Sequence, residues 1–188
     1  MLAMTTKFAA LIFCGLIAVS ELPALAAPVC DVKATVPATA RTYAKTGDQE
    51  TWREFKSVQD VPPLDSNGGV SAQFWQDETG ASFAYIAEPG EDFWTYTRYC
   101  FDRAGRLERV GFELRTAWGW GYRLEGLVVK GVSHANSSAF FSTENEKPIS
   151  RPSSADDIPD ALRPSLYLTL HQLPFARLVV SSPQTTGR

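Results

Sequence analysis

Short runs of aromatic and β-branched residues alternate with glycine-containing turns from Val70 to about Lys130. Runs of this composition at hairpin spacing are typical of antiparallel β-strands. Residues 137–143 form one further run of the same kind. The pattern predicts a mainly β protein whose antiparallel sheet has about six strands, as a sandwich or a curved meander, with short helical pieces. An α+β fold is the alternative prediction.

Two of the turns share the pattern Asp-x-x-Gly, at residues 77–80 and 102–105. A three-residue loop that ends in glycine is typically a type I turn closed by a bulge, because glycine adopts the left-handed conformation without steric cost. Both turns are therefore predicted to join neighbouring strands into hairpins.

The second turn also predicts a register for its hairpin, since Asp102 then faces Arg106 and the pairing continues residue by residue. One face of the hairpin then holds these facing pairs: Trp94 and Leu114, Tyr96 and Phe112, Arg98 and Val110, and Cys100 and Glu108. Side chains alternate between the two faces of a strand. The face that holds these pairs is the more apolar one, so we expect it to be the core face.

The first residues have the three zones of a secretory signal peptide. A single positive charge, Lys7, precedes an apolar run from Phe8 to Val19, and residues 24–26 (Ala-Leu-Ala) match the small-x-small cleavage pattern. An uncleaved membrane anchor is the alternative, but a spanning helix needs about 20 apolar residues and this run is shorter. We expect cleavage of residues 1–26 and export to the periplasm or the medium.

The rest of the chain is expected to form one domain with irregular ends. Residues 27–69 are rich in Pro, Thr and Ala and lack a sustained period, which predicts an extended segment; within it, residues 52–58 fit either a short strand or a helix face. Residues 70–180 form the β-rich core, in which residues 144–159 have the prolines and serines of a surface loop. The polar tail, residues 181–188, is expected to be loose.

Cysteine usage agrees with export. Cys14 leaves with the signal peptide, and Cys30 and Cys100 remain as an even pair. In an oxidising compartment such a pair predicts a disulfide, with two free thiols as the alternative. The disulfide ties the N-terminal segment across the face that holds Cys100.

Charge and ligand spacing exclude several classes of function. The net charge is −3, which argues against binding to nucleic acid or to an anionic membrane surface, since both require a basic patch. No second apolar run could span a membrane. The two histidines, His134 and His171, stand apart, so no metal site or cofactor is predicted.

The most distinctive stretch is Trp118-Gly-Trp120-Gly-Tyr122, flanked by Arg115 and Arg123. Aromatic rings beside arginines can hold a sugar, a peptide or a charged group, which makes these five residues the candidate ligand-binding site. The alternative is that the tryptophans fill the core while the glycines relieve crowding.

No catalytic motif is present, and neither histidine lies near a serine in a nucleophile elbow. Three glutamates on predicted strands, Glu108, Glu113 and Glu125, could act as paired carboxylates. We therefore expect an exported non-catalytic protein that binds an envelope protein or a small ligand through the aromatic and glycine stretch. A hydrolase of cell-wall or polysaccharide material that uses strand carboxylates is the alternative.

Overall fold

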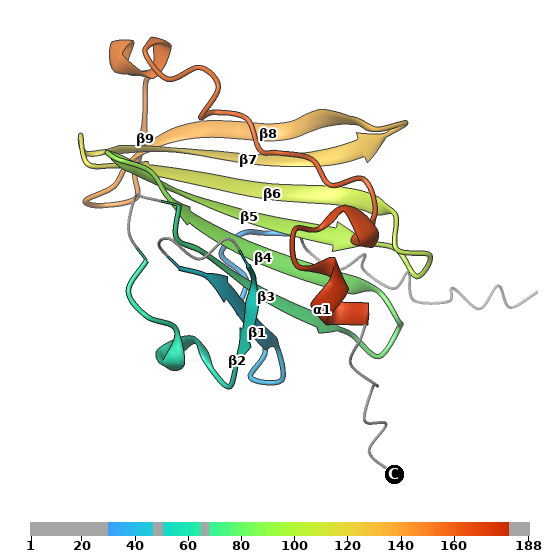
Figure 1. Cartoon of the computed structure of the whole chain (residues 1–188). Coiled ribbons are helices and arrows are strands. Elements are labelled where there is room, and N and C mark those ends of the chain that lie inside the picture. Colours follow the sequence, from blue (N-terminus) through green and yellow to red (C-terminus); the bar gives the residue numbers. More distant parts are fainter. Residues whose placement is uncertain (1–29, 47–50, 65–67, 181–188) are drawn as a thin grey trace, which may run out of the picture.

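The protein forms one open antiparallel sheet of nine strands, in the order β2-β1-β3-β4-β5-β6-β7-β8-β9 (Figure 1). The computed structural model describes residues 30–46, 51–64 and 68–180, so the predicted signal peptide and C-terminal tail lie outside the described residues. The strands are β1 (Arg41–Lys45), β2 (Arg53–Phe55), β3 (Val70–Gln76), β4 (Ser82–Pro89), β5 (Phe93–Phe101), β6 (Leu107–Thr116), β7 (Trp120–Val129), β8 (Val132–Ser142) and β9 (Pro148–Ile149). The prediction of a mainly β fold built on an antiparallel sheet is confirmed.

The six strands expected from the sequence are the long meander β3–β8, and the three further strands are short additions at the two edges. The helical pieces are also short: η1 (Val58–Asp60), η2 (Ser153–Asp156), η3 (Leu170–Gln172) and α1 (Ala176–Val180). No helix in the described part of the chain is long and apolar enough to cross a membrane.

Both Asp-x-x-Gly turns have the predicted geometry. Gly80 and Gly105 have φ angles of +83° and +74°, in the left-handed region that glycine favours. The backbone N–H of Asp102 donates to the carbonyl of Arg106 at 2.8 Å, and the Asp102 carboxylate accepts the Arg106 N–H, also at 2.8 Å. Local hydrogen bonds thus fix each hairpin at its turn.

The register predicted for the β5–β6 hairpin is wrong by one residue. Phe101 faces Leu107 as expected, but Cys100 faces Arg109, so Glu108 is the extra residue of a β-bulge. Every pair beyond the bulge is displaced, and Trp94 faces Arg115 in place of Leu114. A slip of one residue moves the side chains of one strand to the other face relative to its partner. The predicted core face is therefore confirmed for Val110, Phe112 and Leu114 of β6, and it is wrong for the β5 residues Trp94, Tyr96, Arg98 and Cys100.

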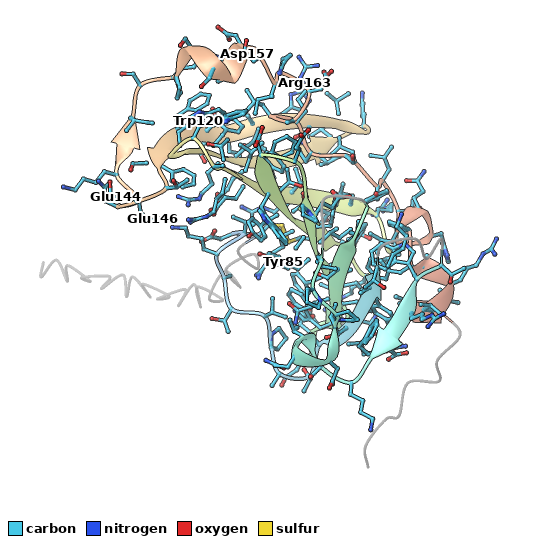
Figure 2. The ribbon with its side chains drawn as sticks, turned by 60° about the vertical axis from the view of Figure 1, so that its left-hand side comes forward. Tyr85, Trp120, Glu144, Glu146, Asp157 and Arg163 are labelled. Carbon is cyan, nitrogen blue, oxygen red and sulfur yellow. A yellow bond between two sulfur atoms is a disulfide. The ribbon has the colours of Figure 1, made fainter. Side chains whose placement is uncertain are left out.

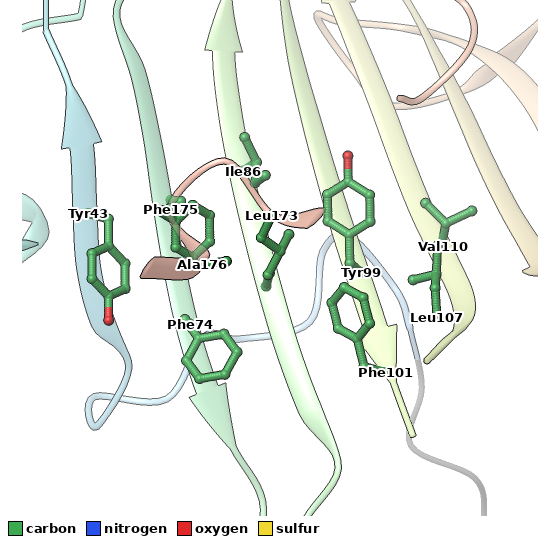
Figure 3. Packing of buried hydrophobic residues seen from close by; sticks show 12 residues of the cluster. Tyr43, Phe74, Ile86, Tyr99, Phe101, Leu107, Val110, Leu173, Phe175 and Ala176 are labelled. Atoms are coloured by element: carbon green, nitrogen blue, oxygen red, sulfur yellow. The ribbon is translucent and has the colours of Figure 1, made fainter. Parts of the chain in front are cut away.

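The core face is the one that the C-terminal segment covers. Leu173, Phe175 and Ala176 pack over β1, β3 and β5, where the ring of Phe175 stacks on Tyr43 with centroids 5.0 Å apart (Figure 3). A second cluster on the same face joins Phe112, Leu114, Trp120 and Ala155. Burial of these apolar side chains is the main source of stability for the sheet.

The opposite face is crossed by residues 30–36, which we call the strap; part of it runs in blue behind the sheet in Figure 1. A disulfide joins Cys30 to Cys100, as predicted, with Cα atoms 6.0 Å apart. The strap lies directly on β6, because a Cβ atom added at Gly111 would be 2.2 Å from the carbonyl oxygen of Cys30. Only glycine allows the strap to approach so closely.

Candidate functional site

A hollow of about 360 Å³ lies between the strap and the sheet. The strap contributes Val32, Lys33, Ala34 and Val36, and strands β3 to β6 contribute Gln73, Tyr85, Tyr96, Glu113 and Arg115. A second hollow of about 290 Å³ shares Tyr96 and Arg115 and extends to the β4–β5 turn. We call the two together the strap groove. Its size is that of a small-molecule site.

Three aromatic rings follow one another along the strap groove. Tyr85 on β4 lies 6.2 Å from Tyr96 on β5, measured between ring centroids, and Tyr96 lies 6.2 Å from Trp94. The ring planes differ by 24° and 16°. The row forms because Trp94 and Tyr96 alternate onto one face of β5, and because neighbouring strands bring Tyr85 beside them. It gives the groove an apolar wall.

The phenol hydroxyls of Tyr85 and Tyr96 make no hydrogen bond to another residue of the described ranges. Burial raises the pKa of Tyr85 to about 12 and also raises the pKa of Tyr96. Both phenols therefore stay neutral near neutral pH and keep a proton to donate. Each hydroxyl can therefore donate a hydrogen bond to a ligand in the groove.

A cluster of charged side chains closes one side of the groove. Glu113, which is buried, accepts hydrogen bonds from the Nε atoms of Arg115 and Arg123, the latter at 2.7 Å. Glu146 binds the same two arginines and also Lys33 of the strap (Figure 2 labels Glu146 and Tyr85). Three cations thus share two carboxylates, which leaves the cluster with a net positive charge.

Arg98 adds a further positive charge beneath the strap. Its side chain is buried, one Nη atom donates to the carbonyl oxygen of Ala34, and its guanidinium lies 5.2 Å from the centre of the Trp75 ring. Its Nε atom has no partner within the described residues. Burial lowers the pKa of Arg98, but an arginine remains protonated in proteins. Arg98 therefore holds the strap and makes its underside electropositive.

The predicted site residues lie on two different faces. Arg115 lines the strap groove and Arg123 belongs to the charge cluster. Trp120 is buried on the core face, where its Nε1 donates to the hydroxyl of Ser154 at 3.0 Å, and Tyr122 packs there against Phe140. Trp118 is exposed at the β6–β7 turn. Trp120 thus fills the core, and the five predicted residues (Arg115, Trp118, Trp120, Tyr122 and Arg123) do not lie together in one site.

The sequence pattern does not single out Tyr85 and Tyr96 as binding residues. The alternation on β5 places Tyr96 on the same face as Arg98 and Cys100, which the pattern predicts to be the core face. The signal in the sequence is Arg98, which lies in the middle of an otherwise apolar face. An arginine is rarely fully buried unless it is paired, so its position indicates that this face is not an ordinary core face.

The three strand glutamates do not share a hollow in the described structure. Glu113 is bound by two arginines, Glu125 is half-buried near β8, and Glu108 is the extra residue of the β-bulge and lines a different hollow. A paired-carboxylate hydrolase needs two carboxyl groups on opposite sides of one substrate bond. Within the described residues, no three His, Cys, Asp or Glu side chains are grouped so that they could hold a metal ion.

The attachment of the strap through Glu146 is expected to depend on pH. The hydrogen bond from Lys33, followed by those from Arg115 and Arg123, lowers the pKa of Glu146 from 4.5 to about 2. A carboxylate with a depressed folded-state pKa stabilises the fold above its unfolded pKa, and this contribution disappears as pH falls through the folded value. We expect Glu146→Gln to reduce the stability difference between pH 6 and pH 2, measured as the urea midpoint.

The matched control for this pH experiment is Glu144→Gln, which removes an exposed carboxylate two residues away (Figure 2). That variant should keep the pH dependence of the wild type. Identical pH profiles for Glu146→Gln and the wild type would show that Glu146 does not hold the strap.

Comparison with known proteins identifies no relative: no family model, no curated protein and no solved structure matches this chain.

Proposed function

We propose that the protein is an exported, non-catalytic binding protein that holds a small acidic saccharide in the strap groove. The observation that carries this proposal is the groove itself, in which Arg115 and two neutral phenols that bond to no other described residue surround a hollow beneath a disulfide-tied strap. Export is supported by the disulfide and by the signal-like start of the chain.

The chemistry of the lining favours an oxygen-rich ligand. Tyr85, Tyr96 and Arg115 all donate hydrogen bonds, so they suit hydroxyl and carboxylate oxygens. The aromatic row offers an apolar surface for the C–H side of a sugar ring. Beneath the strap, the positive charge of the cluster and of Arg98 favours an anion. Glu91 and Asp92 line the second hollow, so the acidic group of the ligand is placed in the first hollow. A ring that carries both hydroxyl groups and a carboxylate meets all three conditions.

Tyr96→Phe is expected to weaken this binding about tenfold, because it removes one hydrogen-bond donor and keeps the ring. Binding is measured by calorimetry with short oligosaccharides of a uronic acid, beside their neutral counterparts. The neutral sugars should bind more weakly than the acidic ones. The matched control is Tyr122→Phe, which makes the same change on the core face and should leave affinity unchanged.

Two results would overturn the proposal. One is the absence of binding by both classes of saccharide at millimolar concentration. The other is an equal loss of affinity in Tyr96→Phe and Tyr122→Phe, which would show a general effect on folding. Release of shortened sugars during the titration would favour a hydrolase instead.

A further inference from the structure

The strap groove is made of two hollows that share one wall. The hollow beneath the strap and the hollow at the β4–β5 turn have Tyr96 and Arg115 in common. The stacked rings of Tyr96 and Trp94, with centroids 6.2 Å apart, continue that wall from the first hollow into the second. Each hollow is close to the volume of about 300 Å³ at which small-molecule sites begin. The groove therefore has room for two joined sugar rings, one in each hollow.

The second hollow differs from the first in its charge. Glu91 and Asp92 of the β4–β5 turn line it, and both are exposed. Neither carboxylate has a hydrogen-bonding or ion-pairing partner among the described residues. Arg115, the cation of this lining, is already paired with Glu113 and Glu146. The second hollow therefore has an excess of negative charge, whereas the first is electropositive.

Backbone hydrogen bonds hold the two acids beside the hollow. The turn is closed by the N–H of Gly90, which donates to the carbonyl of Phe93 at 2.6 Å. The N–H of Ala117, on the β6–β7 turn, donates to the carbonyl of Asp92 at 2.8 Å. The ring of Phe93 packs on Gly90, where an added Cβ atom would be 2.8 Å from the ring. The acidic turn is thus fixed to the sheet, so its charge acts on any group that enters the second hollow.

We infer that the ligand of the strap groove alternates an acidic sugar ring with a neutral one, and that the neutral ring occupies the second hollow. The inference rests on the proposed function and adds the order of the rings. A carboxylate in the second hollow would meet the like charges of Glu91 and Asp92, and this repulsion selects against a second acidic ring. A neutral ring meets no such repulsion. Trp94, which is 37% exposed, offers its indole to the C–H side of that ring.

The hydrogen-bonding groups of the two hollows differ in the same sense as their charges. The first hollow presents donors, which are the phenols of Tyr85 and Tyr96 and the guanidinium of Arg115, and these suit a carboxylate. The second hollow presents the acceptor oxygens of Glu91 and Asp92, which suit the hydroxyl groups of a neutral sugar. A chain of uronic acid alone would match the first hollow and be repelled by the second.

The test compares two disaccharides with the same acidic ring and the same linkage, one carrying a second uronic acid and the other a neutral sugar. Calorimetry on the full mature, disulfide-bonded protein should show that the mixed disaccharide binds about fivefold more tightly, as expected for repulsion between exposed like charges. Glu91→Gln combined with Asp92→Asn should raise the affinity for the diuronate and remove this preference. The matched control, Glu78→Gln with Asp160→Asn, removes two exposed carboxylates that line neither hollow and should keep the preference.

Trp94→Ala tests the place of the second ring separately. It should weaken binding of the mixed disaccharide about fivefold, because the aromatic surface of the second hollow is lost. It should leave the affinity for a single uronic acid unchanged, since that ring lies beneath the strap. An equal loss of affinity for the disaccharide and for the single ring would overturn the inference.

Equal binding of the two disaccharides by the wild type, or tighter binding of the diuronate, would also overturn the inference and leave the proposed function standing. A control variant that loses the preference as fully as the Glu91 and Asp92 variant would overturn it too, because the effect would then come from the overall charge. The absence of binding by either disaccharide would overturn the proposed function together with the inference. The two failures are therefore distinguishable.

Discussion

Replacement of both Cys30 and Cys100 by serine is expected to lower the free energy of unfolding by about 4 kcal/mol and to abolish binding in the strap groove. The disulfide closes a loop with a sequence separation of 70, and a loop of this size restricts the unfolded chain strongly. The strap begins at Cys30, so without the disulfide its first residue is no longer fixed to β5. The measurements are urea titration and calorimetry with the acidic saccharide.

The remaining contacts of the strap are too weak to replace the disulfide. They are the burial of Val32 against β6, the hydrogen bond from Arg98 to Ala34 and the ion pair between Lys33 and Glu146. An exposed ion pair contributes about 0–1 kcal/mol. Wild-type protein treated with a reductant should therefore resemble the double variant. Equal urea midpoints and equal affinities for the oxidised wild type and the variant would contradict this account of the strap.

Trp120→Ala is expected to lower the free energy of unfolding by about 3–5 kcal/mol, the usual cost of removing a large buried aromatic side chain. The indole is 4% exposed and packs against Phe140, and its N–H donates to Ser154. Affinity for the acidic saccharide should stay near the wild-type value wherever the variant is folded, because Trp120 lies on the opposite face from the hollow beneath the strap. Thermal unfolding and calorimetry measure the two quantities.

Trp118→Ala provides the matched control, since it removes the same side chain at the exposed turn, where 46% of the residue is accessible. A surface substitution of this kind usually changes stability by less than about 0.5 kcal/mol. Weaker binding in Trp118→Ala, together with unchanged stability in Trp120→Ala, would assign the site to the aromatic and glycine stretch. The groove proposal would then fail.

The two faces of this sheet are covered by segments from the two ends of the described residues. The C-terminal segment covers the core face with apolar side chains, while the strap covers the opposite face through one disulfide, the buried Val32 and polar contacts. Polar and charged groups remain under the strap because it shields only part of that face. A site for a small ligand is therefore compatible with a well-packed core on the other side.

The sequence alone determined the features that depend on local interactions. The six long strands follow from alternating residues between turns, and the turn at Gly105 follows from the left-handed conformation that only glycine adopts at low cost. The disulfide followed from the count of two remaining cysteines. Arg115 is a predicted site residue that lines the groove, but the sequence does not indicate its neighbours there, Tyr85 and Tyr96.

Only the tertiary structure decided which face is the core and where the groove lies. The bulge at Glu108 has no strong local signal. It pairs Val110 with Tyr99 and not with Arg98, so that Tyr99 and Phe101 of β5 join the core face. The groove gathers its lining from four strands and from the strap, which lie far apart in the sequence. Such long-range packing depends on the shapes and the burial of all the packed segments together. A local pattern of residues therefore cannot predict it.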